Sequence, residues 1–444
     1  MRLLIILVFA GFFGSVTAKV YSLGEIVGIA VKNARSIKVI EQEMYKSEAE
    51  VQAVYGQSFP RVSFQLNMSH NFSDVDYVFA PTGNEFVDNL LNSISTVIEP
   101  KQSSGQVGLN LDQPLFAQGK VYYGLKLAKK NRVILNCKLQ EEKLRVRGAI
   151  VKQYFNALMR NRNYQIANES VIIAREAHRV VTSRQSAGTS SEFDTLSSRL
   201  HLKNAELALT KTEIDRRTAY ETLLTTTGIE ESQSSFDIID SVPLREYTLD
   251  LDQTLDLVKR DNLTLVQLSG YSEVFDYKIK LAQTEYLPGI FAGIILGRNG
   301  QFNGYSEIDN IRWIDSRIVH AGLKWDIFSG TIRNQRLSQA RIDRTIFDLN
   351  EKQAIENMVL SARNAYDNVT MSKEQLVLAG EVVMLAEQAL SLAKISYDAG
   401  SKIYLDLQNA ELELHKAKMA ENNARYSYFT TVVDLQILTG TLQF

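Results

Sequence analysis

Four segments of the chain alternate apolar and polar residues with a period of two. They lie at about residues 61–72, 104–113, 289–298 and 317–327. Alternation of this kind is typical of a β-strand with one apolar and one polar face. The third segment is more uniformly apolar than the others, so the pattern leaves its facing open.

Most of the remaining chain is predicted to be helical. A first helix is expected at about 22–56, where apolar residues recur at helical spacing. The sequence from about 120 to 186, and again from about 333 to 398, contains no proline and few turn residues. At about 1.5 Å per residue, each of these two stretches would extend about 100 Å as a helix. Each is expected to return through a glycine turn, at Gly188 and Gly400, into a further helix.

The second long helix contains two parallel rows with seven-residue spacing. The first row is Ile355, Ala362, Val369, Leu376, Val383, Leu390 and Tyr397; the second is Met358, Ala365, Ser372, Ala379, Ala386 and Ala393. A sustained seven-residue repeat keeps one side of a helix against its neighbours by supercoiling, and small side chains permit close approach. An ordinary helical-bundle core would explain the same rows equally well.

The chain is internally duplicated. The same landmarks recur in the same order: Pro60 and Pro288, Phe116 and Phe328, Gly188 and Gly400, and Thr227-Gly228 and Thr439-Gly440. We therefore predict a first repeat at 19–228, a linker at 229–247 and a second repeat at 248–444. Each repeat would contain a helix, two strands and a long helical hairpin.

The N-terminus indicates export. Arg2 precedes an apolar stretch from Leu3 to Phe13, and Val16-Thr17-Ala18 supplies small residues for cleavage, so residues 1–18 are interpreted as a signal peptide. From composition, we expect that no later stretch approaches the roughly 20 apolar residues of a membrane helix. Cys137 is the only cysteine, which excludes a disulfide within the chain.

Composition argues against nucleic-acid binding and against catalysis. The 49 basic residues are scattered among 51 acidic ones, without a basic block. The five histidines are dispersed without metal-ligand spacing, and no phosphate-binding or nucleophile motif occurs. We therefore expect no enzyme activity, no metal and no cofactor.

The strands predict an assembly of several chains. A half-apolar sheet in an exported protein can face lipid only if it closes without an open edge, and about eight strands is the smallest membrane barrel. Two, three or four copies would give eight, twelve or sixteen strands. Polar loops at about 73–103 and 299–315 would join the strands of each pair. The lipid-facing side is expected to include Phe64, Leu66, Val107, Leu109, Leu323 and Trp325.

At this point the chain resembles the TolC family of outer-membrane efflux and secretion channels. The resemblance is carried by the duplication, by Phe59-Pro60 and Leu287-Pro288 before strands, and by Pro114-Leu115-Phe116 and Ile327-Phe328-Ser329-Gly330 after them. It implies an α+β membrane channel in which three identical chains form a twelve-strand outer-membrane barrel and a long helical tunnel in the periplasm. It also implies a passive duct that is opened by a periplasmic adaptor and an inner-membrane RND, ABC or MFS transporter.

The resemblance also assigns residues to the periplasmic tip. Tyr397, Lys402 and Asp194 match positions that hold the family's tunnel closed, with lysine here in place of arginine. Asp406 and Asn409 match two acidic positions of the constriction, so only one ring of carboxylates is expected.

A second hypothesis is an exported coiled-coil protein without a pore, either a periplasmic adaptor or a structural spacer. Long helical hairpins would serve such a protein equally well, whereas the duplicated strand pairs favour the channel. The sequence does not determine the exported substrate or the partner pump.

Overall fold

A computed structural model describes residues 19–72, 80–97, 103–229, 236–239, 247–302 and 311–442. The predicted signal peptide lies outside these residues. The chain divides into two compact units. We call Met1–Met44, Ile134–Gly270 and Leu349–Phe444 the helical unit, and Tyr45–Val133 and Tyr271–Asp348 the sheet unit.

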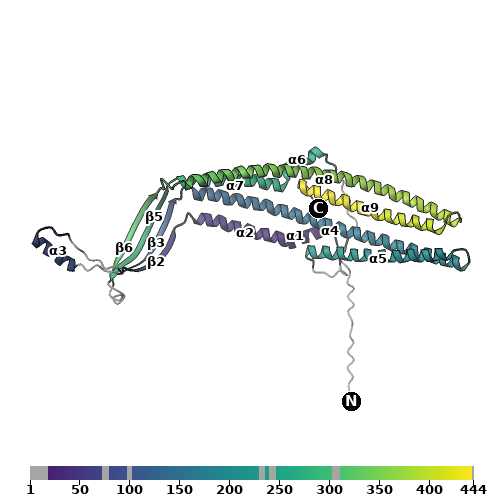
Figure 1. Ribbon diagram of the computed structural model, residues 1–444, viewed down its shortest axis with the longest axis horizontal. Helices are drawn as coiled ribbons and strands as arrows, with labels where there is room; N and C mark the ends of the chain where they lie inside the picture. Colours follow the sequence, from purple (N-terminus) through teal and green to yellow (C-terminus); the bar gives the residue numbers. More distant parts are fainter. Residues whose placement is uncertain are drawn as a thin grey trace, which may run out of the picture. The chain divides into compact units, whose positions relative to one another are not determined.

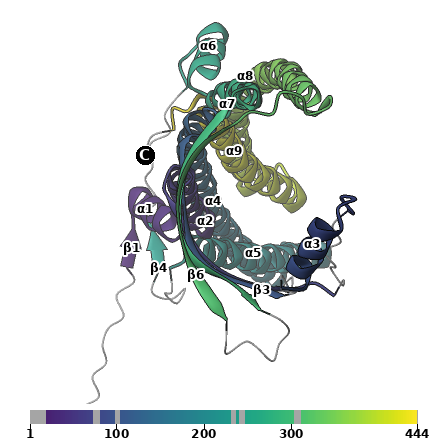
Figure 2. The ribbon, with the colours of Figure 1, turned by 90° about the vertical axis from the view of Figure 1, so that its left-hand side faces the viewer.

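The sheet unit contains four antiparallel strands in the order β2, β3, β5, β6, and Figures 1 and 2 show them as one curved layer. Their bounds are β2 (Arg61–His70), β3 (Ser103–Phe116), β5 (Gly289–Phe302) and β6 (Arg312–Lys324). All four predicted strands exist. The prediction of 317–327 for the last one was wrong at both ends. At the N-terminal end, Asp315 and Arg317 hid the alternation because they are charged residues on the apolar face. At the C-terminal end, Trp325 follows the strand.

The strand register decides which residues share a face. Phe64 lies opposite Leu109, and Leu109 lies opposite Leu296. Directly opposed residues of antiparallel strands project to the same face. The facing of β5, which the sequence left open, is therefore fixed by its pairing with β3. On the other face, Gly108 lies opposite Gly297. A Cβ atom added to Gly297 would stand 2.6 Å from the Val107 carbonyl oxygen, which is too close for any other residue without a shift.

The segment predicted as a polar loop at 73–103 contains a helix, α3 (Glu85–Val97). Its N-terminus is capped by Asn84, whose side-chain oxygen accepts hydrogen bonds from the backbone N–H groups of Phe86 (3.1 Å) and Val87 (3.4 Å). The prediction missed this helix because its apolar residues are interspersed with asparagine and serine.

Each repeat begins with two helices rather than one. These are α1 (Leu23–Asn33) and α2 (Arg35–Gly56) in the first repeat, and α6 (Leu251–Asp261) and α7 (Leu263–Gln283) in the second. The single helix predicted at 22–56 was therefore wrong. A short 3-10 turn, η2 (Thr284–Tyr286), follows α7.

The same kind of hydrogen bond occurs at the break between the two helices of each pair. The Asn33 amide donates to the Thr227 carbonyl oxygen (3.3 Å), and the Asn262 amide donates to the Leu438 carbonyl oxygen (2.9 Å). In both repeats an asparagine at the break thus satisfies a carbonyl at the end of the hairpin, where a helix has unpaired acceptors.

The two long hairpins confirm the predicted duplication. They consist of α4 (Lys120–Ser186) with α5 (Glu192–Thr227), and of α8 (Ile332–Asp398) with α9 (Tyr404–Thr439). The long helices have 67 residues each and the return helices 36 each. Of the predicted heptad rows of α8, Ala362, Val369, Ser372 and Ala393 are buried. The other row residues are half-buried, except Ile355, which is exposed, so the rows pack within the chain only in part.

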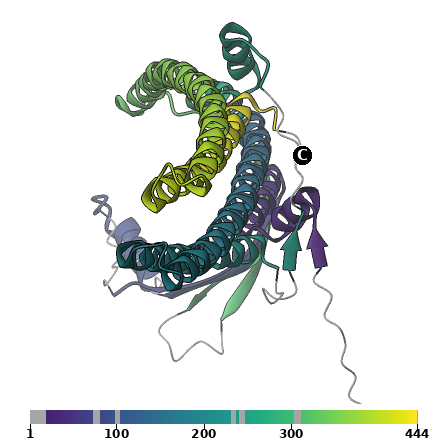
Figure 3. The same cartoon turned by 90° about the vertical axis from the view of Figure 1, so that its right-hand side faces the viewer.

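The core of the helical unit lies where α1, α4, α5 and α9 meet. Val151, Tyr154, Leu223 and Val433 are almost fully buried in it. The Tyr154 hydroxyl donates to the Ile239 carbonyl oxygen at 2.7 Å. The predicted linker at 229–247 also contains a strand, β4 (Phe236–Ile238), which pairs in parallel with β1 (Lys19–Tyr21), as Figure 3 shows.

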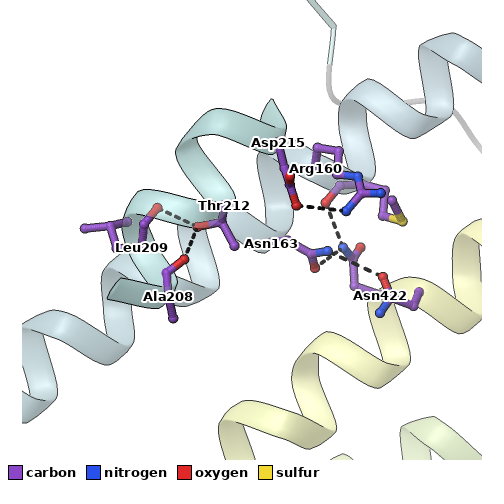
Figure 4. A network of polar contacts seen from close by, with 9 residues as sticks. Arg160, Asn163, Ala208, Leu209, Thr212, Asp215 and Asn422 are labelled. Carbon is purple, nitrogen blue, oxygen red and sulfur yellow. Dashed lines mark hydrogen bonds and ion pairs between the residues drawn. The ribbon is translucent and has the colours of Figure 1, made fainter. Parts of the chain in front are cut away.

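A polar layer crosses the helical unit between α4 and α9 (Figure 4). Asn163 is only 7% exposed. Its side-chain oxygen accepts from the Asn422 amide at 2.7 Å, and its own amide donates to Asn423 at 3.4 Å. Asn422 also donates to the Met159 carbonyl oxygen at 2.9 Å. Buried asparagines of this kind fix the register of packed helices at some cost in stability.

We expect Asn163→Ala to lower the free energy of unfolding by about 1 to 3 kcal/mol, because it leaves buried amide groups without partners. The measurement is the thermal loss of helical circular dichroism in detergent. Asn168→Ala is the matched control, since Asn168 is an exposed asparagine of the same helix. Equal stability of both variants would mean that the layer contributes nothing.

Candidate functional site

The tips of the two hairpins are built alike. Gly188 and Gly400 have φ angles of 76° and 73°, a conformation that costs glycine little. Around each glycine the same closing bond occurs. The Thr189 N–H donates to the Arg184 carbonyl oxygen at 2.8 Å, and the Ser401 N–H donates to that of Ser396 at 2.9 Å. The two predicted glycine turns are therefore confirmed as turns.

Asp194 and Asp406 occupy equivalent positions after the two turns, yet their carboxylates have different surroundings. In the first turn Ser191 is the N-cap of α5, and its N–H (3.2 Å) and hydroxyl (2.7 Å) both donate to the Asp194 carboxylate. In the second turn Ile403 is the N-cap of α9 and makes no side-chain cap. The Asp406 side chain is therefore left exposed in the first turn of its helix.

The cation beside Tyr397 comes from the other hairpin. The Arg184 guanidinium lies over the Tyr397 ring at 4.8 Å and contacts the Asp398 carboxylate at 3.8 Å. The Tyr404 ring packs edge-on against Tyr397, with 6.0 Å between the ring centroids. Sequence reasoning missed Arg184, although a basic residue in the last turn of a helix is a recognisable signal.

Lys402 lies elsewhere in the second turn. Its side chain is exposed and makes no hydrogen bond or ion pair within the described part of the chain, whereas Asp194 caps its own helix. Within one chain the structure therefore does not bring Lys402 and Asp194 together, and their predicted pairing stays a prediction for the assembled protein.

Asp406 and Asn409 both lie exposed on α9. Next to them, the Ser197 hydroxyl of α5 donates to the Gln408 side-chain oxygen at 2.9 Å. This bond joins α5 to α9 beside Asp406.

A cavity farther along the hairpins is lined by Glu169 of α4 and Lys418 of α9 and by three further titratable side chains: His201 of α5, and Glu411 and His415 of α9. One buried polar atom of each of these three has no hydrogen-bond partner among the described residues: His201 Nδ1, Glu411 Oε2 and His415 Nε2. Burial raises the pKa of Glu411 to about 7. Burial also lowers the pKa of His201 and, with the charges of His201 and Lys418, that of His415.

Two of the five histidines that are dispersed in the sequence, His201 and His415, thus line one cavity in the folded chain. In the described residues, no group of three His, Cys, Asp or Glu side chains is arranged to hold a metal ion. We therefore interpret His201, Glu411 and His415 as buried proton-binding groups near the tip.

These groups predict how stability depends on pH. The folded state binds a proton on Glu411 more tightly than the unfolded state, so this contribution is full below about pH 4.5 and is lost as pH rises through about 7. The contribution of the two histidines to stability has the opposite pH dependence. It is present above about pH 6.5 and is lost on acidification.

We expect Glu411→Gln to raise the melting temperature relative to the wild type at pH 8 and to change it little at pH 5. Thermal melts at both pH values test this expectation. Glu413→Gln, at an exposed position of the same helix, should show no such difference. A Glu411→Gln effect that is the same at both pH values would show that the carboxyl does not titrate in this range.

Comparisons with known proteins agree with this geometry. A model of the family described as "Outer membrane efflux protein" matches residues 26–229 and 255–441. The alkaline protease secretion protein AprF of Pseudomonas aeruginosa is 23% identical, with 100% of this chain and 89% of that protein covered. The outer membrane protein TolC of Vibrio cholerae is 22% identical, with 66% of this chain and 67% of that protein covered.

A solved structure shows the same fold. The outer membrane channel CmeC of Campylobacter jejuni superposes with a TM-score of 0.73 at 16% identity, and the match covers 94% of this chain and 85% of that one. The family model spans both repeats and both hairpin tips described above. The chain therefore belongs to the outer membrane efflux protein family, the TolC family of outer-membrane channels that its sequence resembles.

Proposed function

We propose that three copies of this chain form the outer-membrane exit duct of a tripartite efflux pump or a type I secretion system. In this proposal the duct is passive, and a periplasmic adaptor with an inner-membrane transporter opens it. The observation that carries the proposal is that one chain leaves both its sheet edges and two apolar helix stripes uncovered.

The sheet needs partners on both sides. In the described residues, β2 and β6 are the edge strands, and each pairs with only one neighbour. Unpaired backbone groups are too costly in lipid, and four strands are too few to close a barrel. Pairing β6 of one copy with β2 of the next removes every edge, and three copies give twelve strands.

The helical unit supports the same assembly. α5 carries one exposed stripe with seven-residue spacing, and α8 carries another. The stripes are Phe193, Leu200, Leu207 and Ile214 on α5, and Met371, Leu378, Leu385 and Leu392 on α8, each at least half exposed. The exposed stripe of α8 is distinct from the two seven-residue rows that the sequence predicts on this helix. Stripes of equal period can interlock along their length, so the α5 stripe of one copy would cover the α8 stripe of the next.

The α8 stripe also explains an unexpected property of the sequence. By length and composition alone, α8 is apolar enough to cross a membrane, contrary to the expectation that no later stretch is. Only 6% of the apolar 18-residue stretch of α8 that meets this criterion is buried in the single chain. We attribute its apolar character to contact between subunits, because the seven-residue spacing on one side of the helix suits a coiled-coil partner better than lipid.

We expect Leu385→Glu to prevent or weaken assembly, since it places a carboxylate inside the proposed contact between subunits. Mass measurement by light scattering in detergent should show monomers in place of trimers. Gln388→Glu adds the same charge at an exposed polar position one turn away and should leave the trimer intact. A trimeric Leu385→Glu protein would contradict the proposed contact.

At the tip, Asp406 would form a ring of three carboxylates that sets the ion preference of the duct. Its exposed carboxylate supports this role, while Asn409 cannot supply a second ring. Lys402 and Asp194 are proposed to hold the closed state between neighbouring subunits, and Tyr397 would pack beside them. An exposed ion pair contributes only about 0 to 1 kcal/mol, so such a latch would be easily released by an adaptor.

We expect Asp406→Asn to remove most of the cation preference, because the confined carboxylates concentrate cations at the constriction. Asn409→Asp should strengthen it. The measurement is the reversal potential of single channels in a planar bilayer under a salt gradient. Failure to form any channel would refute the duct itself, whereas channels with unchanged selectivity would refute only the assignment of Asp406.

In this proposal the partner transporter selects the exported substrate. AprF, which matches this chain over its whole length, is named for secretion of a protease. At 23% identity this name supports secretion as one candidate and does not exclude efflux of small molecules. The adaptor hypothesis loses its support, because the family match includes the strand-bearing segments of both repeats.

A further inference from the structure

Three charged side chains stand on the apolar face of the sheet. The Arg298 Nε lies 2.9 Å from one oxygen of the Asp315 carboxylate, and an Arg317 nitrogen lies 3.8 Å from the other. All three side chains are at least half exposed, and that of Arg317 is 81% exposed. Two guanidinium groups share one carboxylate, so the cluster has an excess of one positive charge.

The cluster is surrounded by apolar residues. In the strand register Arg298 lies opposite Val107, and Arg317 lies opposite Leu296. A shallow groove joins the three charged residues to Phe64, Leu109 and Leu296. An excess charge in such a place requires a counter-charge whose own surroundings are apolar.

The two tryptophans of the chain indicate the depth of the cluster. Trp313 and Trp325 are twelve residues apart. Trp325 directly follows β6, whose 13 residues extend about 40 Å and so span about 30 Å of a membrane at the usual tilt of barrel strands. Tryptophan collects at membrane interfaces, and Asp315 and Arg317 are two and four residues inward from Trp313. The cluster thus lies just inside one interface, within reach of lipid headgroups.

We propose that Arg298 and Arg317 bind the phosphate headgroup of an anionic membrane lipid, whose acyl chains lie along Phe64, Leu109 and Leu296. Guanidinium groups bind phosphate with two parallel hydrogen bonds, and Asp315 holds Arg298 in place. The apolar part of the groove favours a lipid over free phosphate. This inference rests on the proposed function, because it requires the apolar face to contact the bilayer.

The test uses the two tryptophans as separate reporters. Trp325→Phe leaves Trp313 beside the cluster, and Trp313→Phe leaves Trp325 near the other end of the sheet. Both proteins are reconstituted in bilayers that contain brominated phosphatidylglycerol or brominated phosphatidylcholine, which quench tryptophan fluorescence on contact. At Trp313 we expect a preference of about fivefold for phosphatidylglycerol, since one excess basic charge at an anionic surface contributes about this factor. Trp325 should show no preference.

Variants separate the possible outcomes. Arg298→Gln with Arg317→Gln should abolish the preference at Trp313, while Asp315→Asn should keep or increase it. Equal quenching by both lipids in the unsubstituted cluster would overturn the lipid site and leave the facing of the sheet intact. Quenching at Trp325 but not at Trp313 would show that another subunit covers the cluster, which also overturns the site. If neither tryptophan were quenched, the proposed facing of the barrel itself would fail.

Discussion

The unpaired backbone of two edge strands is the constraint on which the rest of this structure depends. Within the described residues, β2 and β6 each pair with only one neighbouring strand, so the sheet has two open edges. In lipid the backbone groups along these edges can be satisfied only by other strands, so the barrel has to be shared between copies. The helical unit obeys an equivalent constraint, because the stripes on α5 and α8 are exposed in the described part of the chain.

Duplication provides two copies of each element, and small differences between them create specialised positions. At the hairpin tips the backbone bonds are the same, but serine at position 191 is replaced by isoleucine at position 403. The serine binds the Asp194 carboxylate, whereas the isoleucine cannot bind that of Asp406. A single change of cap residue therefore decides which carboxylate is available to the lumen of the proposed duct.

Charged and polar groups inside the packed helices have different consequences from those at the tips. Both polar atoms of the Asn163 side chain are paired with α9, so this layer specifies how α4 and α9 align. In the cavity around Glu411, polar atoms lack partners among the described residues. The stability of the helical unit therefore depends on the protonation of Glu411. The helical unit thus combines one layer that fixes register with one cluster that responds to pH.

The sequence by itself determined the duplication, all four strands, the long hairpins and both glycine turns. These features depend on local periodicity and on residues with restricted or unusual backbone preferences, which are readable along the chain. It also identified the partly buried rows of α8, because a seven-residue repeat directly records a packed side of a helix. It misplaced the ends of β6 and missed α3, since charged or amide residues interrupt their apolar patterns.

Only the tertiary structure decided the relations between distant residues. The facing of β5 follows from its register with β3, and the approach of Arg184 to Tyr397 follows from the docking of two hairpins. His201 and His415 are far apart in sequence and meet only because α5 packs beside α9. Such contacts depend on the packing of whole elements, whereas periodicity describes one element at a time. For that physical reason the sequence established the architecture, and the folded chain decided the surroundings of each site residue.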